Sequence, residues 1–197
     1  GGEDAEKQLR TALAMGADKA VLINIEDDVE ELDQFTAAHI ISEYLKDKNA
    51  DLILAGNVAI DGGSGQVGPR VAESLGINYV TTITNLEING TTVTIKRDVE
   101  GDTEVLETSL PLLVTAQQGL NEPRYPSLPG IMKAKKKTIE RLTAADLSIN
   151  VTDIVSKTEV LEQYLPAKKQ AGKVLAGELN QQTSALVDLL RNEAKVV

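Results

Sequence analysis

Hydrophobic residues recur at helical spacing near the start of the chain and then alternate with short apolar runs. Residues 3–15 predict a helix, and Gly16 follows it as a typical helix stop. The apolar runs at residues 19–24 and 51–56 predict buried strands. Two further helices are expected to bury inner faces formed by Ala37, Ile40, Ile41, Tyr44 and Leu45, and by Val71, Ala72 and Leu75.

This α-β-α-β-α order is typical of a Rossmann-like α/β fold, in which a parallel sheet carries helices on both faces. The middle of the chain then becomes β-rich, over residues 80–86, 87–97 and 103–110. The pair Asn89-Gly90 between β-branched runs predicts an inserted β-hairpin region. Residues 111–116 predict a return to the central sheet.

The chain after residue 120 has a different pattern. Residues 121–129 contain three prolines and predict an extended loop and not a helix. We expect an α/β nucleotide-binding domain over residues 1–150 and a C-terminal extension over residues 151–197. The extension ends in an amphipathic helix, which either docks on its own domain or meets a partner; its apolar residues are Leu179, Leu186, Leu189 and Leu190.

Composition excludes several classes of function. The 197 residues carry a net charge of −10, which disfavours non-specific nucleic-acid binding. There is no cysteine, and the single histidine, His39, falls on the polar side of its helix, so we assign no catalytic residues and no metal site. The acidic run formed by Asp27, Asp28, Glu30, Glu31 and Asp33 is interpreted as solvated. No apolar run predicts a membrane-embedded protein, and the expected location is the cytoplasm or the mitochondrial matrix.

A glycine-rich turn joins the second predicted strand to a helix. Parallel α/β sheets bind nucleotides at such turns, because glycines let the backbone approach a phosphate and the first N–H groups of the helix face the anion. Asp61 would repel a phosphate, so it is expected to cap the turn or to meet a ribose or adenine edge. The turn matches neither the dinucleotide fingerprint nor the P-loop, and a flexible connector is the alternative. The candidate nucleotide-binding residues are Gly56, Asn57, Ala59, Ile60, Asp61, Gly62, Gly63, Ser64, Gly65, Gln66 and Val67.

The segment from Asn121 to Lys137, NEPRYPSLPGIMKAKKK, closely resembles the recognition loop of electron transfer flavoprotein beta subunits. The run TALAMGAD at residues 11–18, and Ala59-Ile60-Asp61 with Gln66, also resemble that family in the same order. The resemblance covers nearly the whole chain and weakens after about residue 150. Compared with the family, the chain is expected to lack the N-terminal strands, about two βα units.

The resemblance implies a heterodimer with an alpha subunit that holds most of an FAD, while residues 56–67 hold a structural AMP. It implies an electron carrier and not an enzyme, which accepts electrons from acyl-CoA dehydrogenases in fatty acid beta-oxidation and passes them to a membrane quinone reductase, electron transfer flavoprotein–quinone oxidoreductase. The alternatives are a bifurcating relative with a second FAD in place of AMP, a freestanding adenine-nucleotide-binding protein of the universal-stress type, and an inert structural subunit.

The resemblance also gives roles to single residues. Leu128 would insert into an apolar pocket of a dehydrogenase, with Arg124 and Tyr125 bracing the loop; otherwise this leucine folds back onto its own surface. Lys133 and Lys136 would steer an acidic partner, or form an ordinary solvated basic stripe. Asp98 would pair with an arginine of the alpha subunit near the flavin, and residues 151–197 would pack on the alpha subunit.

Overall fold

The computed structural model describes residues 1–25, 32–169 and 171–197. The chain forms two compact units, Gly1–Glu159 and Val160–Val197. Most of the predicted acidic run (Asp27, Asp28, Glu30 and Glu31) lies outside the described residues, whereas Asp33 lies within them. None of the helices in the described part of the chain is long and apolar enough to cross a membrane.

The first helix and the first strand are confirmed. The 3₁₀ turn η1 (Glu3–Ala5) leads into α1 (Glu6–Met15), which ends at Gly16 with φ of 121°. Strand β1 (Val21–Ile23) pairs in parallel with β7 (Glu140–Leu142), and these two strands form a small sheet of their own. Leu13 of α1 and Leu22 of β1 lie in one apolar cluster with Ala134 and Ile139.

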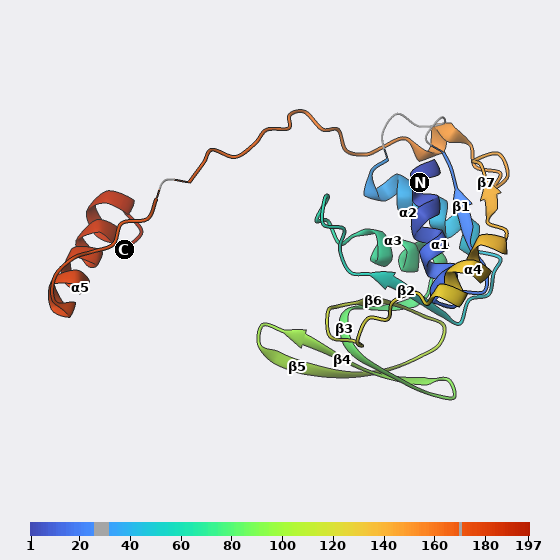
Figure 1. The fold of residues 1–197 in the computed structure, drawn as a ribbon, viewed down its shortest axis with the longest axis horizontal. Coiled ribbons are helices and arrows are strands. Elements are labelled where there is room, and N and C mark those ends of the chain that lie inside the picture. Colours follow the sequence, from blue (N-terminus) through green and yellow to red (C-terminus); the bar gives the residue numbers. More distant parts are fainter. Residues whose placement is uncertain (26–31, 170) are drawn as a thin grey trace. The chain divides into compact units, whose positions relative to one another are not determined.

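The larger sheet has five strands: β2 (Leu52–Gly56), β3 (Asn78–Asn89), β4 (Thr92–Val99), β5 (Asp102–Ser109) and β6 (Leu112–Ala116). Their order is β2-β6-β3-β4-β5 (Figure 1). Strands β2, β6 and β3 run parallel, whereas β3, β4 and β5 are antiparallel. The expectation of a parallel sheet is therefore correct only for part of it, because the hairpin strands join the same sheet.

Helices α2 (Gln34–Leu45) and α3 (Val67–Leu75) cover the same face of this sheet, where Ala38, Val71 and Ala72 pack with Leu113 of β6. On the opposite face, strand residues such as Ile83, Ile95 and Leu112 form a core of their own. Among the described residues, the helices that pack on the five-stranded sheet thus lie on one face, and the expectation of helices on both faces is wrong for this sheet.

The buried side of α2 differs from the predicted one. Its buried residues are Thr36, Ala38, Ile40 and Ser42, whereas Ile41 is 37% exposed. The two hydroxyls are tolerated inside because Thr36 donates to the carbonyl of Ile154 and Ser42 to that of Ala38. Of the four buried residues, the apolar pattern predicted only Ile40, and it missed Ala38 as well as the two hydroxyl residues. His39 is partly buried, and its ring stacks on Phe35.

Strand β2 is less buried than predicted. It lies at one edge of the five-stranded sheet, and Leu54 is 63% exposed. Helix α3 behaves as predicted, with Val71 and Ala72 buried and a stop at Gly76 in the left-handed conformation. The Asn89-Gly90 turn is confirmed, with Gly90 at φ of 62°, but residues 87–89 belong to β3 and not to the following strand.

The proline-rich segment contains a helix that the sequence did not predict. Helix α4 (Leu128–Lys136) begins directly after Ser127, whose side chain accepts a 3.1 Å hydrogen bond from the N–H of Gly130. Pro129 does not prevent the helix, because the N–H groups of a first helical turn need no intrahelical partner. Leu128 is therefore the first residue of a helix and not part of an extended loop.

The first unit continues past residue 150, where the sequence predicted a boundary. The short 3₁₀ helix η2 (Val151–Ile154) follows, and Ile154 is fully buried with Ile25 and Ile40. In the second unit, α5 (Leu179–Asp188) is followed directly by a π-helical segment, Leu189–Ala194. The amphipathic helix predicted for the extension is therefore present.

Candidate functional site

The glycine-rich turn runs from the carboxyl end of β2 to the first turn of α3 (Figure 1). Hydrogen bonds within the turn hold it: the N–H of Gly63 donates to the carbonyl of Ala59 at 2.8 Å, and the carboxylate of Asp61 accepts from the N–H of Gly62 at 2.7 Å. Asp61 thus acts as a cap of the turn. The turn has a defined shape and is more than a flexible connector.

A buried threonine fixes the start of the turn. The hydroxyl of Thr115 in β6 donates to Oδ1 of Asn57 at 3.0 Å and accepts a 3.0 Å hydrogen bond from the backbone N–H of Thr82 in β3. Thr115 is only 1% exposed, so its hydroxyl has both partners inside the protein. Thr82 has φ of 58°, an unusual value for a β-branched residue. The hydroxyl of Thr115 therefore links β6, β3 and the start of the turn.

Two glycines shape the backbone here. A Cβ atom on Gly68 would lie 2.8 Å from Cγ2 of Thr115, so only a glycine allows α3 to pack this closely on β6. Gly65 has φ of 60°, a left-handed conformation that glycine adopts without strain. The first turn of α3 is in this way held against the ends of β2 and β6.

A pocket of about 470 Å³ opens beside the turn, a volume in the range of small-molecule sites. Its walls come from β2, the turn, the start of α3, and Ile41 of α2, the residue that was expected to be buried. Of the predicted nucleotide-binding residues, the pocket contacts Gly56, Asn57, Ala59, Ser64, Gly65, Gln66 and Val67, and it does not contact Ile60, Asp61, Gly62 or Gly63.

The polar groups at the pocket suit an anionic ligand. The first turn of α3 offers backbone N–H groups without helical partners. Arg70 lies in this turn, and its guanidinium donates to Oε1 of Gln66 at 2.9 and 3.1 Å. Ser64 and Gln66 both line the pocket with polar side chains. Within residues 1–25, 32–169 and 171–197, no group of three His, Asp or Glu side chains is placed to hold a metal ion.

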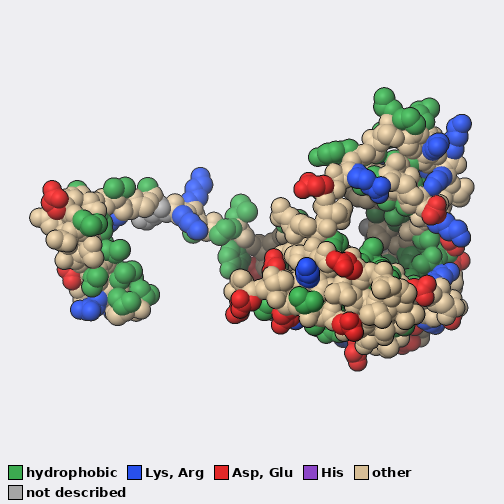
Figure 2. All heavy atoms as spheres, turned by 90° about the horizontal axis from the view of Figure 1, so that it is seen from below, with side chains coloured by type: hydrophobic (Ala, Val, Ile, Leu, Met, Phe, Trp, Pro, Cys, Tyr) green, Lys and Arg blue, Asp and Glu red, His purple; other side chains and the backbone are tan. Residues whose placement is uncertain are grey.

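The second candidate surface is built on α4. Leu128 is 80% exposed at the start of this helix, and Lys133 and Lys136 are exposed further along it. Figure 2 shows that Lys and Arg side chains of the larger unit gather toward the side that carries α4 in Figure 1, while Asp and Glu side chains are more widely spread. An apolar residue and a basic group therefore share one surface despite the negative net charge.

Among the described residues, the structure shows no bracing contact from Arg124 or Tyr125. Arg124 is exposed and the ring of Tyr125 is 91% exposed, so neither packs against the segment. Helix α4 is held by α1 instead. Gly130 lies against the carbonyl of Ala14, where a Cβ atom would come within 2.4 Å of the oxygen. The ammonium group of Lys137 donates to the carbonyl of Ala17 at 2.6 Å.

Asp98 lies in the five-stranded sheet, apart from the glycine-rich turn and from α4. It is an exposed residue of β4 and pairs in register with Thr103 of β5. The neighbouring Arg97 forms a 2.7 Å ion pair with Glu104. The hairpin thus presents Asp98 to solvent, far along the sheet order from β2.

Asp33 was expected to be solvated with the rest of the acidic run, but it is buried and hydrogen-bonded. It caps α2 by accepting from the N–H of Thr36 at 2.8 Å, and its second oxygen accepts from the N–H groups of Lys157 and Thr158 at 2.7 and 3.1 Å. Burial acts to raise the pKa of the carboxyl, but these hydrogen bonds outweigh it and lower the pKa from 3.8 to about 2. A helix cap before residue 34 was detectable from the sequence, but its distant partners were not.

Comparisons with known proteins show the family of the chain. A sequence profile of the electron transfer flavoprotein domain matches residues 1–147. The chain is 64% identical, over all of its 197 residues and 77% of the relative, to the electron transfer flavoprotein subunit beta of Bacillus subtilis. It is 41% identical to the subunit beta of Syntrophomonas wolfei, covering 74% of that protein, and 37% identical to the mitochondrial subunit beta of Oryza sativa subsp. japonica, covering 75%. The whole chain is aligned in both.

The profile match over residues 1–147 thus places the chain among the electron transfer flavoprotein domains. Within that class, the full-length similarity is to one subunit. The chain belongs to the electron transfer flavoprotein beta subunit family. The predicted resemblance is therefore confirmed, and the freestanding universal-stress-type alternative is set aside.

Proposed function

We propose that the protein works as the beta subunit of a heterodimeric electron carrier, in which an alpha subunit holds most of an FAD. Its family membership supports this assignment. Electrons enter from acyl-CoA dehydrogenases of fatty acid beta-oxidation and leave to electron transfer flavoprotein–quinone oxidoreductase at a membrane. The protein itself supplies binding surfaces and orientation, while the flavin supplies the redox chemistry. It works in the bacterial cytoplasm or, as in the mitochondrial relatives, in the matrix.

The pocket beside the glycine-rich turn is the proposed site of a structural AMP. Four features fit this ligand: the volume of about 470 Å³, the apolar wall at Ile41 and Leu54, the N–H groups at the start of α3, and the nearby Arg70. Gly65, Gln66 and Val67 would lie on the phosphate side. The same features are compatible with the adenosine phosphate part of a second FAD, so the released ligand decides between the two.

The surface of α4 is the proposed contact with the electron donor. The observation that carries this proposal is Leu128, which is 80% exposed at the beginning of a helix held firmly by α1. A side chain presented in this way loses little conformational entropy on docking. Lys133 and Lys136 would attract an acidic donor surface and raise the association rate. Asp98 and the extension from residue 151 are assigned to the interface with the alpha subunit.

Electron acceptance by a Leu128→Ala variant tests this function. We expect the KM of an acyl-CoA dehydrogenase for the heterodimer to rise roughly tenfold or more, the usual effect of truncating a hot-spot side chain, with flavin content unchanged. Ile88→Ala is the matched control, because Ile88 is an exposed apolar residue of β3, 48% exposed, outside α4. Unchanged kinetics for Leu128→Ala would contradict the assigned contact.

A further inference from the structure

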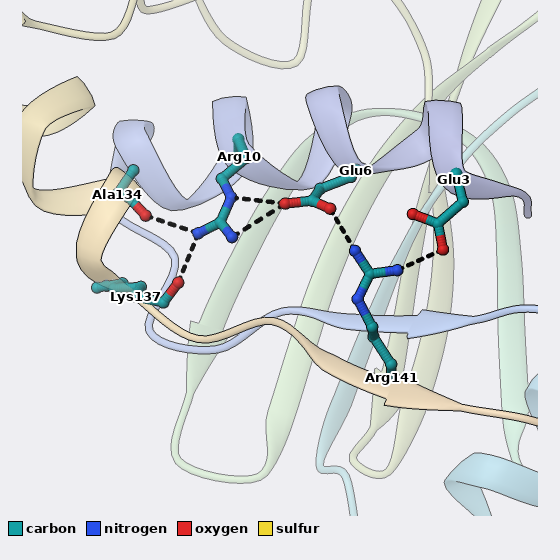
Figure 3. A network of polar contacts seen from close by, with 6 residues as sticks. All are labelled: Glu3, Glu6, Arg10, Ala134, Lys137 and Arg141. Carbon is teal, nitrogen blue, oxygen red and sulfur yellow. Dashed lines mark hydrogen bonds and ion pairs between the residues drawn. The ribbon is translucent and has the colours of Figure 1, made fainter.

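Arg10 of α1 reaches the C-terminal end of α4. Its Nη1 donates to the carbonyl oxygens of Ala134 and Lys137, at 2.9 and 2.5 Å (Figure 3). These carbonyls lie in the last turn of α4 and at its C-cap. The carbonyl of Ala134 already accepts from the N–H of Lys137 at 3.1 Å, so Arg10 is its second donor. The carbonyl of Lys137 lies past the last helical hydrogen bond, where an acceptor needs a partner from outside the helix. A side chain from a different helix therefore caps α4.

The guanidinium of Arg10 is itself held in place. Its Nε and Nη2 both donate to Oε1 of Glu6, at 3.1 and 3.0 Å. The other oxygen of Glu6 accepts from Arg141 at 2.5 Å, and Arg141 also donates to Glu3 at 2.5 Å (Figure 3). A planar guanidinium fixed on one side by a carboxylate keeps its remaining donors in a defined direction. The network thus aims Nη1 at the end of α4.

Helix α4 is restrained along its length as a result. Near its start, Gly130 packs on the carbonyl of Ala14. In its last turn, Ala134 is buried in one cluster with Leu13, and Arg10 binds the carbonyls of Ala134 and Lys137. Leu128 lies two positions before Gly130 and remains 80% exposed. Fixing α4 on α1 therefore fixes the position from which Leu128 projects.

The charges explain why Arg10 is tolerated at this end of α4. The last turn already carries Lys133, Lys135 and Lys136, which interact favourably with the negative end of the helix dipole but repel one another. Glu6 offsets the charge of Arg10, and Glu3 offsets that of Arg141. Arg10 thus contributes its hydrogen bonds to α4 without adding an unbalanced positive charge to the lysine surface.

We propose that Arg10 is a positioning residue for donor docking, which acts by holding α4 so that Leu128 meets the donor in a preformed orientation. The inference rests on the proposed contact between α4 and an electron-donating flavoprotein. Without Arg10, α4 samples more orientations, and the donor must order it on binding. The variant then associates more weakly with the donor, while its flavin content stays unchanged.

The test uses the intact heterodimer and steady-state electron transfer from an acyl-CoA dehydrogenase, with KM for the heterodimer and kcat measured separately. For Arg10→Ala we expect KM to rise roughly two- to tenfold, the cost of ordering one or two side chains, with kcat and flavin content unchanged. Arg10→Lys restores part of the loss, because an ammonium group can donate to both carbonyls. Lys7→Ala is the control, since Lys7 is an exposed residue of the same helix.

A double-mutant cycle separates positioning from a general loss of stability. When Leu128 is already alanine, Arg10→Ala should raise KM by less than about twofold, because no anchor remains to be positioned. Two outcomes would overturn this inference while leaving the donor contact standing. In the first, the effects of the two changes on KM multiply, as they do for independent sites. In the second, Leu128→Ala raises KM but Arg10→Ala leaves it unchanged. No effect of Leu128→Ala would overturn the donor contact and this inference together. If Arg10→Ala folds poorly, Glu6→Gln takes its place in the double-mutant cycle. This variant keeps the donors of Arg10 but weakens the carboxylate contact that orients them.

Discussion

The carboxylate of Asp33 accepts a 2.7 Å hydrogen bond from the backbone N–H of Lys157, although the two residues are 124 positions apart. The same carboxylate caps α2 through Thr36. One side chain therefore fixes both the start of a helix and residues 157–158 near the end of the first unit. Because Glu159 is the last residue of that unit, Asp33 also sets where the chain leaves it.

Replacing Asp33 should weaken folding in a pH-dependent way. Asp33→Ala removes the cap and three further hydrogen bonds to a charged acceptor, and we expect a loss of about 2 to 3 kcal/mol at neutral pH. The pKa of this carboxyl is lowered from 3.8 to about 2 in the folded protein, so its contribution is present above pH 4 and is lost as the pH falls toward 2. Urea unfolding of wild type and Asp33→Asn between pH 2 and 7 measures this.

The stability difference between wild type and Asp33→Asn should be largest above pH 4 and should shrink steadily below it. Asp51→Asn is the control, because Asp51 is an exposed carboxylate. A difference that stays constant from pH 7 to pH 2 would show that the Asp33 charge does not carry the stabilisation.

Gly68→Ala should disturb the nucleotide pocket. The new Cβ atom would lie 2.8 Å from Cγ2 of Thr115, so the start of α3 must move away from β6. We expect destabilisation of about 1 to 3 kcal/mol, typical of overpacking, and a lower content of bound nucleotide. Thermal unfolding and the nucleotide released from purified heterodimer measure the two effects. Gly62→Ala is the matched control, since nothing lies within 4 Å of its Cβ position; equal effects of both variants would contradict this account.

Thr115→Val should loosen the glycine-rich turn at nearly constant side-chain volume. The change leaves Oδ1 of Asn57 and the N–H of Thr82 without the hydroxyl that they share, at a cost of about 1 to 3 kcal/mol. Chemical unfolding measures this cost, and the exposed Thr103 of β5 provides a control as Thr103→Val. If Thr115→Val is as stable as the control, the hydroxyl does not hold the turn.

Charge reversal on α4 should slow association with the electron donor. For Lys133→Glu with Lys136→Glu we expect the second-order rate of flavin reduction to fall about tenfold at low salt and much less at high salt, because screening removes steering by exposed charges. Stopped-flow reduction at several ionic strengths is the measurement, and Lys96→Glu on β4 is the control. A decrease that is independent of salt would contradict the steering role.

Local signals in the sequence predicted local structure well. Gly16, Gly76 and the Asn89-Gly90 pair marked the ends of α1 and α3 and the β3–β4 turn, because each supplies a backbone conformation that other residues rarely adopt. The family string at residues 121–137 identified the surface of α4 but not its helix, since three prolines favoured an extended loop. There the cap by Ser127 decided the outcome.

Contacts between distant segments could not be predicted. The parallel pairing of β1 with β7 and the hydrogen bonds from Arg10 to Lys137 depend on how separate elements pack. Thr115 looked like one residue of an apolar strand, yet its buried hydroxyl joins Asn57 to Thr82. In the sequence, Glu6 and Arg10 are four positions apart, as in many ion pairs on a helix surface. This spacing gave no indication that Arg10 caps α4.

The small molecules bound by the intact heterodimer give the sharpest test of the proposed electron carrier with a structural AMP. The protein is purified with its alpha subunit and denatured, and the released small molecules are identified by absorbance and mass. The account predicts one FAD and one AMP for each heterodimer, and loss of AMP but not FAD in Gly68→Ala. A colourless heterodimer without nucleotide would contradict the proposed carrier, and two FAD molecules with no AMP would contradict the assignment of the pocket beside Gly65.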